Sequence, residues 1–315
     1  MSSKIRFATA AVCGALLTAA CTGGGGGVDA SSTSPLPGST SPTASPPEEP
    51  TAAPSWGGVN VAVKYDQPGF NFRDDGTARS GFENDLALFL KRALGFKGMA
   101  YSDVPSKDRE KVLVEGTADL VIATYSITAD REKKIDFAGP YLQTRQGLLV
   151  RKGDRSIKEI KDTADKVVCT VEGSTSDGNA SVPSIRKQLR TLMPEAVVDL
   201  RTDYSDCVAR LEAGEVHAVW TDLAVLYGFM EHHKGVEVVE NLEIGSPQRY
   251  GIGVQEGREE QCRQIAEKLR DFLNSPDWGG YFKYHFSGLA DRDPEFEQKH
   301  KPNPEDIDKY SCSDD

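Results

Sequence analysis

From residue 59 onward, the chain alternates short runs rich in β-branched residues with segments of helical periodicity. The first of these runs is Val59–Val63, and apolar residues then recur at spacings of three and four between positions 81 and 94. Strands that alternate with helices over this length are typical of α/β domains with parallel sheets. We therefore expect the folded part of the chain to be α/β, with parallel sheets.

The expected elements form two similar rounds and a return. The first round has strands at 59–63 and 119–123 and helices at 81–94 and 107–115, with a turn at 66–69; the second has strands at 166–171, 197–200 and 218–220 and helices near 182–192, at 206–213 and at 223–232; the return has a strand at 250–254 and a helix at 258–273. This order predicts two lobes that are joined by two crossings. Lobe 1 would contain residues 56–147 and 252–290, and lobe 2 residues 148–251.

The two crossings have candidate hinge strands in the extended stretches 146–151 and 248–254. A cleft between the lobes would receive the carboxyl ends of strands and the first turns of helices, which is where ligands bind in open α/β sheets. We therefore expect the ligand site to lie in this cleft.

The N-terminus has the proportions of a secretory signal peptide, residues 1–20. Lys4 and Arg6 precede an apolar stretch of 14 residues, Phe7–Ala20, which is too short to cross a bilayer as a helix. Cys21 follows two alanines, as in the bacterial lipobox, where the signal is cut before the cysteine and the cysteine takes acyl chains such as palmitate. The alternative is an ordinary signal peptide with an incidental cysteine. We expect an exported protein, anchored by lipid to the outer face of the cell membrane.

Two further segments have a biased composition. Residues 21–55 begin with the predicted lipidated cysteine and consist mainly of Gly, Ser, Thr, Pro and Ala, so we expect a disordered linker. Residues 291–315 carry nine Asp or Glu against four Lys or Arg, and we expect this acidic C-terminal tail to be solvated. The net charge of the whole chain is −11, which gives it no electrostatic reason to bind nucleic acid or an anionic lipid surface.

Four cysteines remain when Cys13 and Cys21 are set aside. They show no Cys-x-x-Cys spacing and no nearby pair of histidines, so we expect neither a metal site nor a cofactor. Four cysteines allow three pairings, and we favour Cys169–Cys207, inside one predicted lobe, with Cys262–Cys312, which would hold the tail on a helix. Each bond would close a loop of some 40 to 50 residues and contribute roughly 4 kcal/mol in the chain-entropy picture.

Four motifs follow one another in the order and at the distances of a known family. They are Gly81-Phe82-Glu83-x-Asp85-Leu86; the stretch from Asp119 to Phe137, with Thr124-x-Ser126-Ile127-Thr128-x-x-Arg131; Glu172-Gly173-Ser174-Thr175; and Trp220-Thr221-Asp222. Together they resemble family 3 solute-binding proteins, the extracytoplasmic amino-acid receptors of ABC importers. The resemblance covers about 59–286 and implies a two-lobed, type II periplasmic-binding-protein-like fold. Asn84 departs from the apolar residue that is usual in the first motif.

The resemblance implies a site for the α-carboxylate of a free amino acid. The planar guanidinium of Arg131 suits a bidentate hold on a carboxylate. Ser126, the loop Ser174–Thr175 and the main-chain N–H groups of Thr124 and Thr175 would complete the carboxylate site. The alternative for Arg131 is a solvated residue at a helix start.

Asp222 would receive the ammonium group of the ligand. It follows the apolar run 218–220 and precedes a predicted helix, so its alternative role is an ordinary N-cap.

Two cations would set the specificity for the ligand side chain. Lys64 ends the first strand, where this family places a group that faces the ligand side chain, and Arg109 stands where its acidic-amino-acid receptors carry an arginine. A buried cation without a partner is costly, so this pair favours an anionic ligand. We expect glutamate, then aspartate. Alternatively, Arg109 belongs to a charged surface and Lys64 is an exposed strand end, and the receptor binds glutamine or asparagine.

The function implied is ligand binding by closure, without catalysis. A ligand that contacts both lobes would shift the hinge equilibrium towards the closed form, which an ABC permease and ATPase complex in the membrane would recognise. We expect a monomer. An enzyme on the same fold, such as a dehydratase of a carboxylated ring, would need a general acid in the cleft, and no motif singles one out. A sensor that signals to a membrane partner would have the same ligand site and cannot be separated from a transport receptor by sequence.

Overall fold

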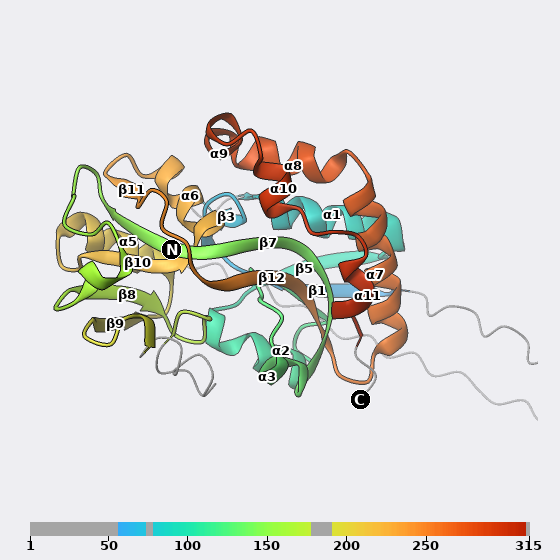
Figure 1. Cartoon of the computed structure of the whole chain (residues 1–315). Coiled ribbons are helices and arrows are strands. Elements are labelled where there is room, and N and C mark those ends of the chain that lie inside the picture. The colour runs from blue at the N-terminus through green and yellow to red at the C-terminus, as the bar shows by residue number, and fades with distance from the viewer. Residues whose placement is uncertain (1–55, 74–77, 178–190, 313–315) are drawn as a thin grey trace, which may run out of the picture. The chain divides into compact units, whose positions relative to one another are not determined.

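The computed structural model describes residues 56–73, 78–177 and 191–312, and Figure 1 shows how their elements are arranged. The expected signal peptide, the lipidated Cys21 and the linker lie outside the described residues. So does nearly all of the helix expected near 182–192. Within the described ranges, no helix has the length and apolar character needed to cross a membrane.

A nine-stranded sheet runs through the described residues, in the order β5-β1-β6-β12-β7-β10-β8-β9, with β11 beside β7. Its strands are β1 (Gly58–Val63), β5 (Gly98–Asp103), β6 (Leu120–Ile122), β7 (Ile135–Arg151), β8 (Val167–Val171), β9 (Val197–Arg201), β10 (Ala218–Asp222), β11 (Val236–Val238) and β12 (Ile244–Gln255). A small second sheet contains β2 (Asp66–Gln67), β3 (Asn71–Arg73) and β4 (Arg79–Ser80). The turn expected at 66–69 thus begins with a short strand.

The large sheet is mixed, so the expectation of parallel sheets is only partly right. β1 is parallel to β5 and β6, and β8 is parallel to β9 and β10. In the middle, β7 is antiparallel to β10, β11 and β12, and β12 is antiparallel to β6. The reason is that β7 and β12 carry the chain across the sheet in opposite directions, which Figure 1 shows as two long neighbouring strands.

We call β1 to β6 with their helices the first half, and β8 to β11 with theirs the second half. The two expected hinge stretches lie inside β7 and β12, which take part in both halves. The α/β class is therefore confirmed, while the lobe boundaries given above stay a prediction.

The helices connect the strands and cover the sheet. They are α1 (Phe82–Leu94), η1 (Ser106–Asp108), α2 (Arg109–Val114), α3 (Ala129–Glu132), η2 (Ile160–Thr163), α5 (Tyr204–Ala213), α6 (Leu223–His232), α7 (Glu259–Asn274), α8 (Asp277–His285), α9 (Ser287–Arg292), α10 (Phe296–His300) and α11 (Asp306–Tyr310). In α1, the apolar positions Phe82, Leu86 and Leu90 are fully buried, as their spacing predicts. Gly95 then ends the helix in the left-handed conformation.

The expectation of a solvated C-terminal tail is wrong for the described residues 291–312. Ile307 is fully buried, His300 is 6% exposed, and the main-chain N–H of Cys312 donates to the carbonyl oxygen of Phe137 in β7. These residues bury an apolar side of α10 and α11, while the acidic side chains of the segment lie mostly outside. The number of charged residues in the segment did not reveal that its apolar residues are buried.

Both disulfides in the structure are the pairs that the sequence analysis favours. Cys169 and Cys207 join β8 to α5 within the second half, with an S–S distance of 2.00 Å. Cys262 and Cys312 join α7 to the C-terminal segment, with an S–S distance of 2.12 Å.

Candidate functional site

A small cavity lies where strands of both halves end. It is lined mainly by polar residues, which come from β2, η1, the start of α2, the loops after β6 and β8, the start of α5, the end of β10 and the start of α6: Gln67, Ser106, Arg109, Thr124, Ser126, Ser174, Thr175, Tyr204, Thr221, Asp222 and Val225. The cavity leaves a volume of about 10 Å³ that the centre of a water molecule can occupy. A ligand larger than water therefore fits only when side chains turn or the halves move apart.

Asp222 presents an unpaired carboxylate oxygen at this cavity. Its Oδ2 accepts a hydrogen bond from the Tyr250 hydroxyl at 2.5 Å, whereas its Oδ1 is buried and has no hydrogen-bond partner among the described residues. Burial raises the pKa of Asp222 to about 6. Although Asp222 is the residue before α6, its side chain makes no capping hydrogen bond. The N-cap alternative is therefore wrong, and Oδ1 is available to a cation.

Arg109 is a buried cation that lines the cavity. Its side chain is 2% exposed, so the alternative of a charged surface residue is wrong. Among the described residues, no carboxylate lies within ion-pair distance of its guanidinium, and burial followed by repulsion from Arg131 lowers its pKa. Four of its five N–H groups donate instead to the carbonyl oxygens of Ser106, Ala123, Thr124 and Gly173, at 2.9 to 3.0 Å.

Arg131 lies beside the cavity and does not line it. It is 3% exposed, so it is no solvated helix start. Its Nε is 3.2 Å from Oε1 of Glu110, and its Nη1 and Nη2 donate to the carbonyl oxygens of Ser126 and Gly173 at 2.7 and 2.9 Å. To hold a ligand carboxylate as expected, Arg131 must exchange these carbonyl oxygens for those of the ligand.

The buried ring of Tyr125 lies close to both guanidinium groups. The Cζ atoms of Arg109 and Arg131 lie 4.5 and 4.8 Å from the centroid of its ring. Cation–π contacts of this kind stabilise buried guanidinium groups. Two like charges are thus held close together next to the cavity.

Lys64 is fully buried, so the alternative of an exposed strand end is wrong. Its Nζ lies 3.2 Å from Oδ1 of Asp66 and 3.4 Å from Oγ of Ser106. Lys64 does not line the cavity itself and reaches it through Ser106. Because Asp66 already pairs with it, Lys64 does not need an anionic ligand, and this part of the argument for glutamate is lost.

Thr124 cannot provide its main-chain N–H to a ligand in this arrangement. That N–H donates to Oε1 of Glu83 at 2.6 Å, and the Thr124 hydroxyl donates to Oε1 of Gln67 at 2.9 Å. The same oxygen of Glu83 accepts the Tyr141 hydroxyl at 2.5 Å. Glu83 is fully buried, which raises its pKa to about 7. Thr124 lines the cavity, but the expected carboxylate site loses its main-chain N–H.

The loop after β8 supplies hydroxyl groups to the cavity. Thr175 Oγ1 accepts a hydrogen bond at 3.0 Å from Nε2 of Gln146 in β7. The other amide atom of Gln146, Oε1, is buried and has no hydrogen-bond partner within the described part of the chain. Ser174 Oγ donates to the carbonyl oxygen of Val171 at 2.6 Å. Ser126, from the first half, forms an isolated bridge with Tyr250.

The two halves meet around the cavity. Lys107 Nζ is 2.9 Å from Oε2 of Glu172, and a Cβ at Gly173 would lie 2.4 Å from the Cα of Lys107. Asp66 Oδ2 accepts the N–H of Tyr204, the first residue of α5, at 2.7 Å. Because the two halves touch through these contacts, the cleft between them is closed.

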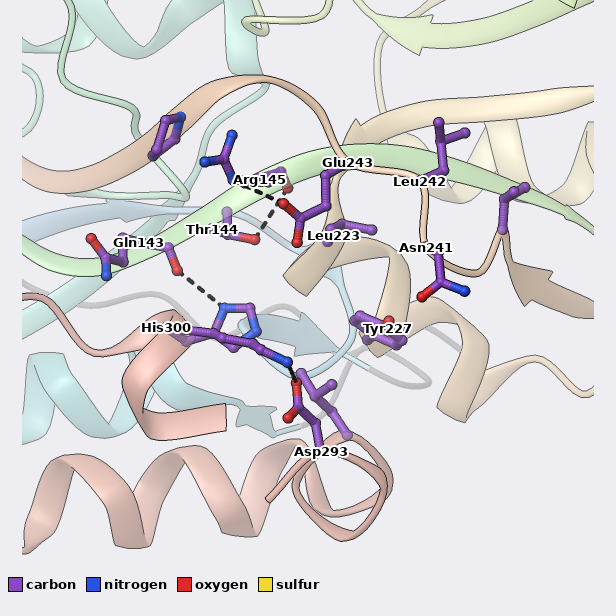
Figure 2. A pocket seen from close by; sticks show the side chains of 14 residues that line it. Gln143, Thr144, Arg145, Leu223, Tyr227, Asn241, Leu242, Glu243, Asp293 and His300 are labelled. Atoms are coloured by element: carbon purple, nitrogen blue, oxygen red, sulfur yellow. Dashed lines mark hydrogen bonds and ion pairs between the residues drawn. The ribbon is translucent and has the colours of Figure 1, made fainter. Parts of the chain in front are cut away.

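A larger cavity, of about 470 Å³, lies among β7, α6, the chain before β12 and the C-terminal segment, as Figure 2 shows. Its charged groups satisfy one another: Arg145 pairs with Glu243 at 2.9 Å and Lys299 with Asp293 at 2.7 Å. His300 Nδ1 is 3.1 Å from the carbonyl oxygen of Gln143, and burial lowers the pKa of His300 to about 4. We assign no ligand to this cavity.

Comparison with known proteins decides the family. Residues 59–286 match the model of the bacterial extracellular solute-binding proteins, family 3. The chain belongs to this family.

The family 3 relatives of this protein differ in the ligand that their names give. The glutamate-binding protein GluB of Corynebacterium glutamicum is 34% identical over 68% of this chain and 73% of its own length. The glutamine-binding protein GlnH of Bacillus subtilis is 30% identical over 71% of this chain and 80% of its own. An ancestral arginine-binding protein, solved with glutamine bound, aligns with a TM-score of 0.65 and 28% identity over 73% of this chain and 97% of its own.

Six of the eight ligand residues expected in this family 3 protein line the cavity, and Lys64 and Arg131 lie next to it. Sequence reasoning missed Asp66 and Gln67, which a turn prediction hid, and Ser106 and Tyr204, which carry no motif. It also missed Glu83, whose place in the first motif was the available signal.

Proposed function

We propose that this protein is a membrane-anchored extracytoplasmic receptor that binds a free acidic amino acid, glutamate ahead of aspartate, and delivers it to an ABC importer. One observation carries the proposal. The cavity is lined by a buried guanidinium that lacks a carboxylate partner among the described residues, Arg109, and by a carboxylate with an unpaired oxygen, Asp222. An acidic amino acid carries both missing charges, since its ammonium group would pair with Asp222 and its side-chain carboxylate with Arg109.

Each group then has a role in ligand binding. Asp222 Oδ1 receives the ammonium group. Arg131 takes the α-carboxylate together with the hydroxyl groups of Ser126, Ser174 and Thr175, after it releases the carbonyl oxygens of Ser126 and Gly173. Arg109 and Lys64 face the distal end of the ligand, and the Thr124 hydroxyl lies between the two ends.

Binding is proposed to act by closure. Arg109, Thr124 and Ser126 belong to the first half, and Ser174, Thr175 and Asp222 to the second, so one ligand would contact both. A ligand that binds only when both halves meet shifts the hinge equilibrium towards the closed form. The ABC permease and ATPase would recognise that form, and the receptor would act as a monomer without catalysing a reaction.

Glutamine is the second candidate ligand. The observation in its favour is the ion pair between Lys64 and Asp66, which leaves Arg109 as the cation that distinguishes a side-chain carboxylate from a carboxamide. The relative named for glutamine is 30% identical, close to the 34% of the relative named for glutamate. A sensor that reports an amino acid to a membrane partner would use the same site.

Two substitutions test these roles by calorimetry with glutamate, aspartate, glutamine and asparagine. Arg131→Ala should abolish the binding of all four, because each has an α-carboxylate. Arg109→Ala should weaken the two acids selectively. Equal losses for all four ligands in Arg109→Ala would contradict its role in specificity.

A separate substitution tests the anchor. Cys21→Ser should move the exported protein from the membrane fraction to the soluble fraction, since lipid attachment needs the thiol. Retention of the variant in the membrane fraction would contradict a lipid anchor at Cys21.

A further inference from the structure

Asp66 contacts both halves of the protein and the cation that the sequence assigns to the ligand side chain. Its carboxylate is 2% exposed, with Oδ1 at 3.2 Å from Nζ of Lys64. Its Oδ2 accepts the N–H of Tyr204 at 2.7 Å, and its carbonyl oxygen accepts the hydroxyl of Ser205 at 3.1 Å. The first N–H groups of a helix have no acceptor within the helix, so Asp66 provides one for α5.

Two of the described contacts link this carboxylate to the ligand cavity: one is with the neutral main-chain N–H of Tyr204, which lines the cavity, and the other is with the charged ammonium group of Lys64. Its Nζ lies 3.4 Å from Oγ of Ser106, and Ser106 lines the cavity. The Lys64 side chain is completely buried, so its charge is weakly screened by solvent. Whatever sets the net charge at Lys64 therefore acts on the end of a ligand that reaches Ser106.

We propose that Asp66 sets the preference of the receptor between a side-chain carboxylate and a side-chain carboxamide, because it compensates the charge of Lys64 and holds the ammonium group back from the cavity. This inference rests on the proposed function and names the determinant of its ligand class. With Asp66 in place, a ligand meets a buried pair of no net charge, which a carboxamide can contact without loss. Without Asp66, Lys64 is a buried cation that lacks a partner, and such a cation favours an anion.

The closed cleft fixes this arrangement. Tyr204 belongs to the second half and Asp66 to the first, so the hydrogen bond between them exists only when the halves meet. Closure therefore holds the carboxylate next to Lys64 at the stage when the ligand is enclosed. Asp66 is a positioning residue for Lys64, since it does not line the cavity.

Three variants test the proposal through the ratio of the dissociation constants for glutamine and glutamate. Asp66→Asn removes the charge and keeps an oxygen that can accept the Tyr204 N–H. The ratio should rise roughly tenfold or more, in favour of glutamate. The double variant Lys64→Met with Asp66→Asn removes both charges, and its ratio should return to the value of the unaltered protein or fall below it.

Asp293→Asn is the matched control. Asp293 also pairs with a lysine, Lys299, at 2.7 Å, but both residues line the larger cavity and neither lines the ligand cavity, so the ratio should not change. Thermal melting of each variant shows whether it is folded. If Asp66→Asn does not fold, the double variant tests the proposal instead, because it leaves neither charge of the pair buried and unpaired. A glutamine-to-glutamate ratio in the double variant above that of the unaltered protein would contradict the proposal.

Binding to the unaltered protein and to Asp66→Asn distinguishes failure of the proposed function from failure of the role of Asp66. If the unaltered protein binds neither glutamate nor glutamine, the proposed function is wrong. If it binds one or both and Asp66→Asn changes the two affinities by the same factor, Asp66 has a structural role alone and this inference is overturned.

Discussion

Asp222 and Glu83 are buried carboxylates whose pKa values are raised to about 6 and about 7, chiefly by burial. Their surroundings give them different tasks. Asp222 lines the ligand cavity and keeps one oxygen unpaired, whereas Glu83 uses one oxygen to hold the Thr124 N–H and the Tyr141 hydroxyl. Titration of Asp222 should therefore affect ligand binding, and titration of Glu83 should affect stability.

Ligand affinity should be constant between pH 7 and 8 and should fall as the pH is lowered through about 6. Below this value the empty receptor protonates Asp222, and a ligand ammonium group must displace that proton. The affinity should then decrease by up to about tenfold per pH unit, as measured by calorimetry in buffers from pH 8 to 5. The side chain of glutamate stays ionised over this range.

Asp222→Asn is the variant that assigns this pH dependence. It should lower the affinity roughly a hundredfold, because the ammonium group loses its charged partner, and the remaining binding should not vary with pH. Asp291→Asn, at an exposed position, should behave like the unaltered protein. An unchanged affinity from pH 7 to 5 in the unaltered protein would contradict the role of Asp222.

Glu83→Gln should make the stability of the protein less dependent on pH. The folded-state pKa of about 7 exceeds the ordinary value of 4.5, so Glu83 contributes stability that is complete below pH 4.5 and is lost as the pH rises through 7. A glutamine oxygen can still accept both hydrogen bonds. Relative to the unaltered protein, the variant should gain roughly 3 kcal/mol between pH 5 and 8 in denaturant unfolding. Parallel curves for the two proteins would show that Glu83 does not titrate in this range.

At the scale of elements, the loop after β8 controls how closely the halves approach. Gly173 in this loop has φ +78°, and its carbonyl oxygen accepts hydrogen bonds from both Arg109 and Arg131. A Cβ on Gly173 would lie 2.4 Å from the Cα of Lys107 in the other half. A Cβ cannot come this close to a main-chain atom, so any side chain at this position should keep the cleft open.

Gly173→Ala is therefore expected to weaken ligand binding roughly tenfold or more, since the closed form becomes inaccessible. Gly153→Ala is a matched control: Gly153 has φ +82°, but a Cβ there would contact nothing within 4 Å. Both variants should lose about 1–2 kcal/mol of stability through backbone strain, and only Gly173→Ala should lose affinity. Equal affinities in the two variants would contradict the close approach at Lys107.

The sequence predicted the elements whose own periodicity is strong and missed what depends on other parts of the chain. α1 and α6 lie at or within one residue of their expected positions, because their apolar residues repeat at helical spacing. The short strand β2 and the partner of Lys64 were missed, since a turn-rich stretch gives no sign that Asp66 is buried. In the same way, the family motifs identified Arg131 and Asp222, but only the fold shows which of their atoms are already occupied.

The whole molecule has one disulfide near the ligand site and one away from it. Cys169–Cys207 joins β8 to α5, which lead to or carry cavity residues, whereas Cys262–Cys312 joins α7 to a C-terminal segment that supplies none. Their sequence separations are 38 and 50 residues. The two bonds should therefore resemble each other in stability and differ in their effect on binding.

Replacing both cysteines of a pair with serine should lower the free energy of unfolding by about 4 kcal/mol in either case. Ligand affinity should stay unchanged in the Cys262/Cys312 variant. It should decrease in the Cys169/Cys207 variant, because the loop after β8 and the start of α5 lose their covalent link. Denaturant unfolding measures the effect on stability, and calorimetry at 25 °C measures the effect on affinity. A loss of affinity in the Cys262/Cys312 variant would contradict this expectation and show that the C-terminal segment contributes to ligand binding.

The central claim is that the cavity between the two halves binds a free acidic amino acid. Titration calorimetry of the exported domain against glutamate, aspartate, glutamine, asparagine and arginine tests it most directly. The account predicts that glutamate binds tightest, that aspartate follows, and that arginine does not bind, because Arg109 and Arg131 repel a cationic side chain. If arginine or the neutral amino acids bind while neither glutamate nor aspartate does, the cavity is not a site for an acidic amino acid.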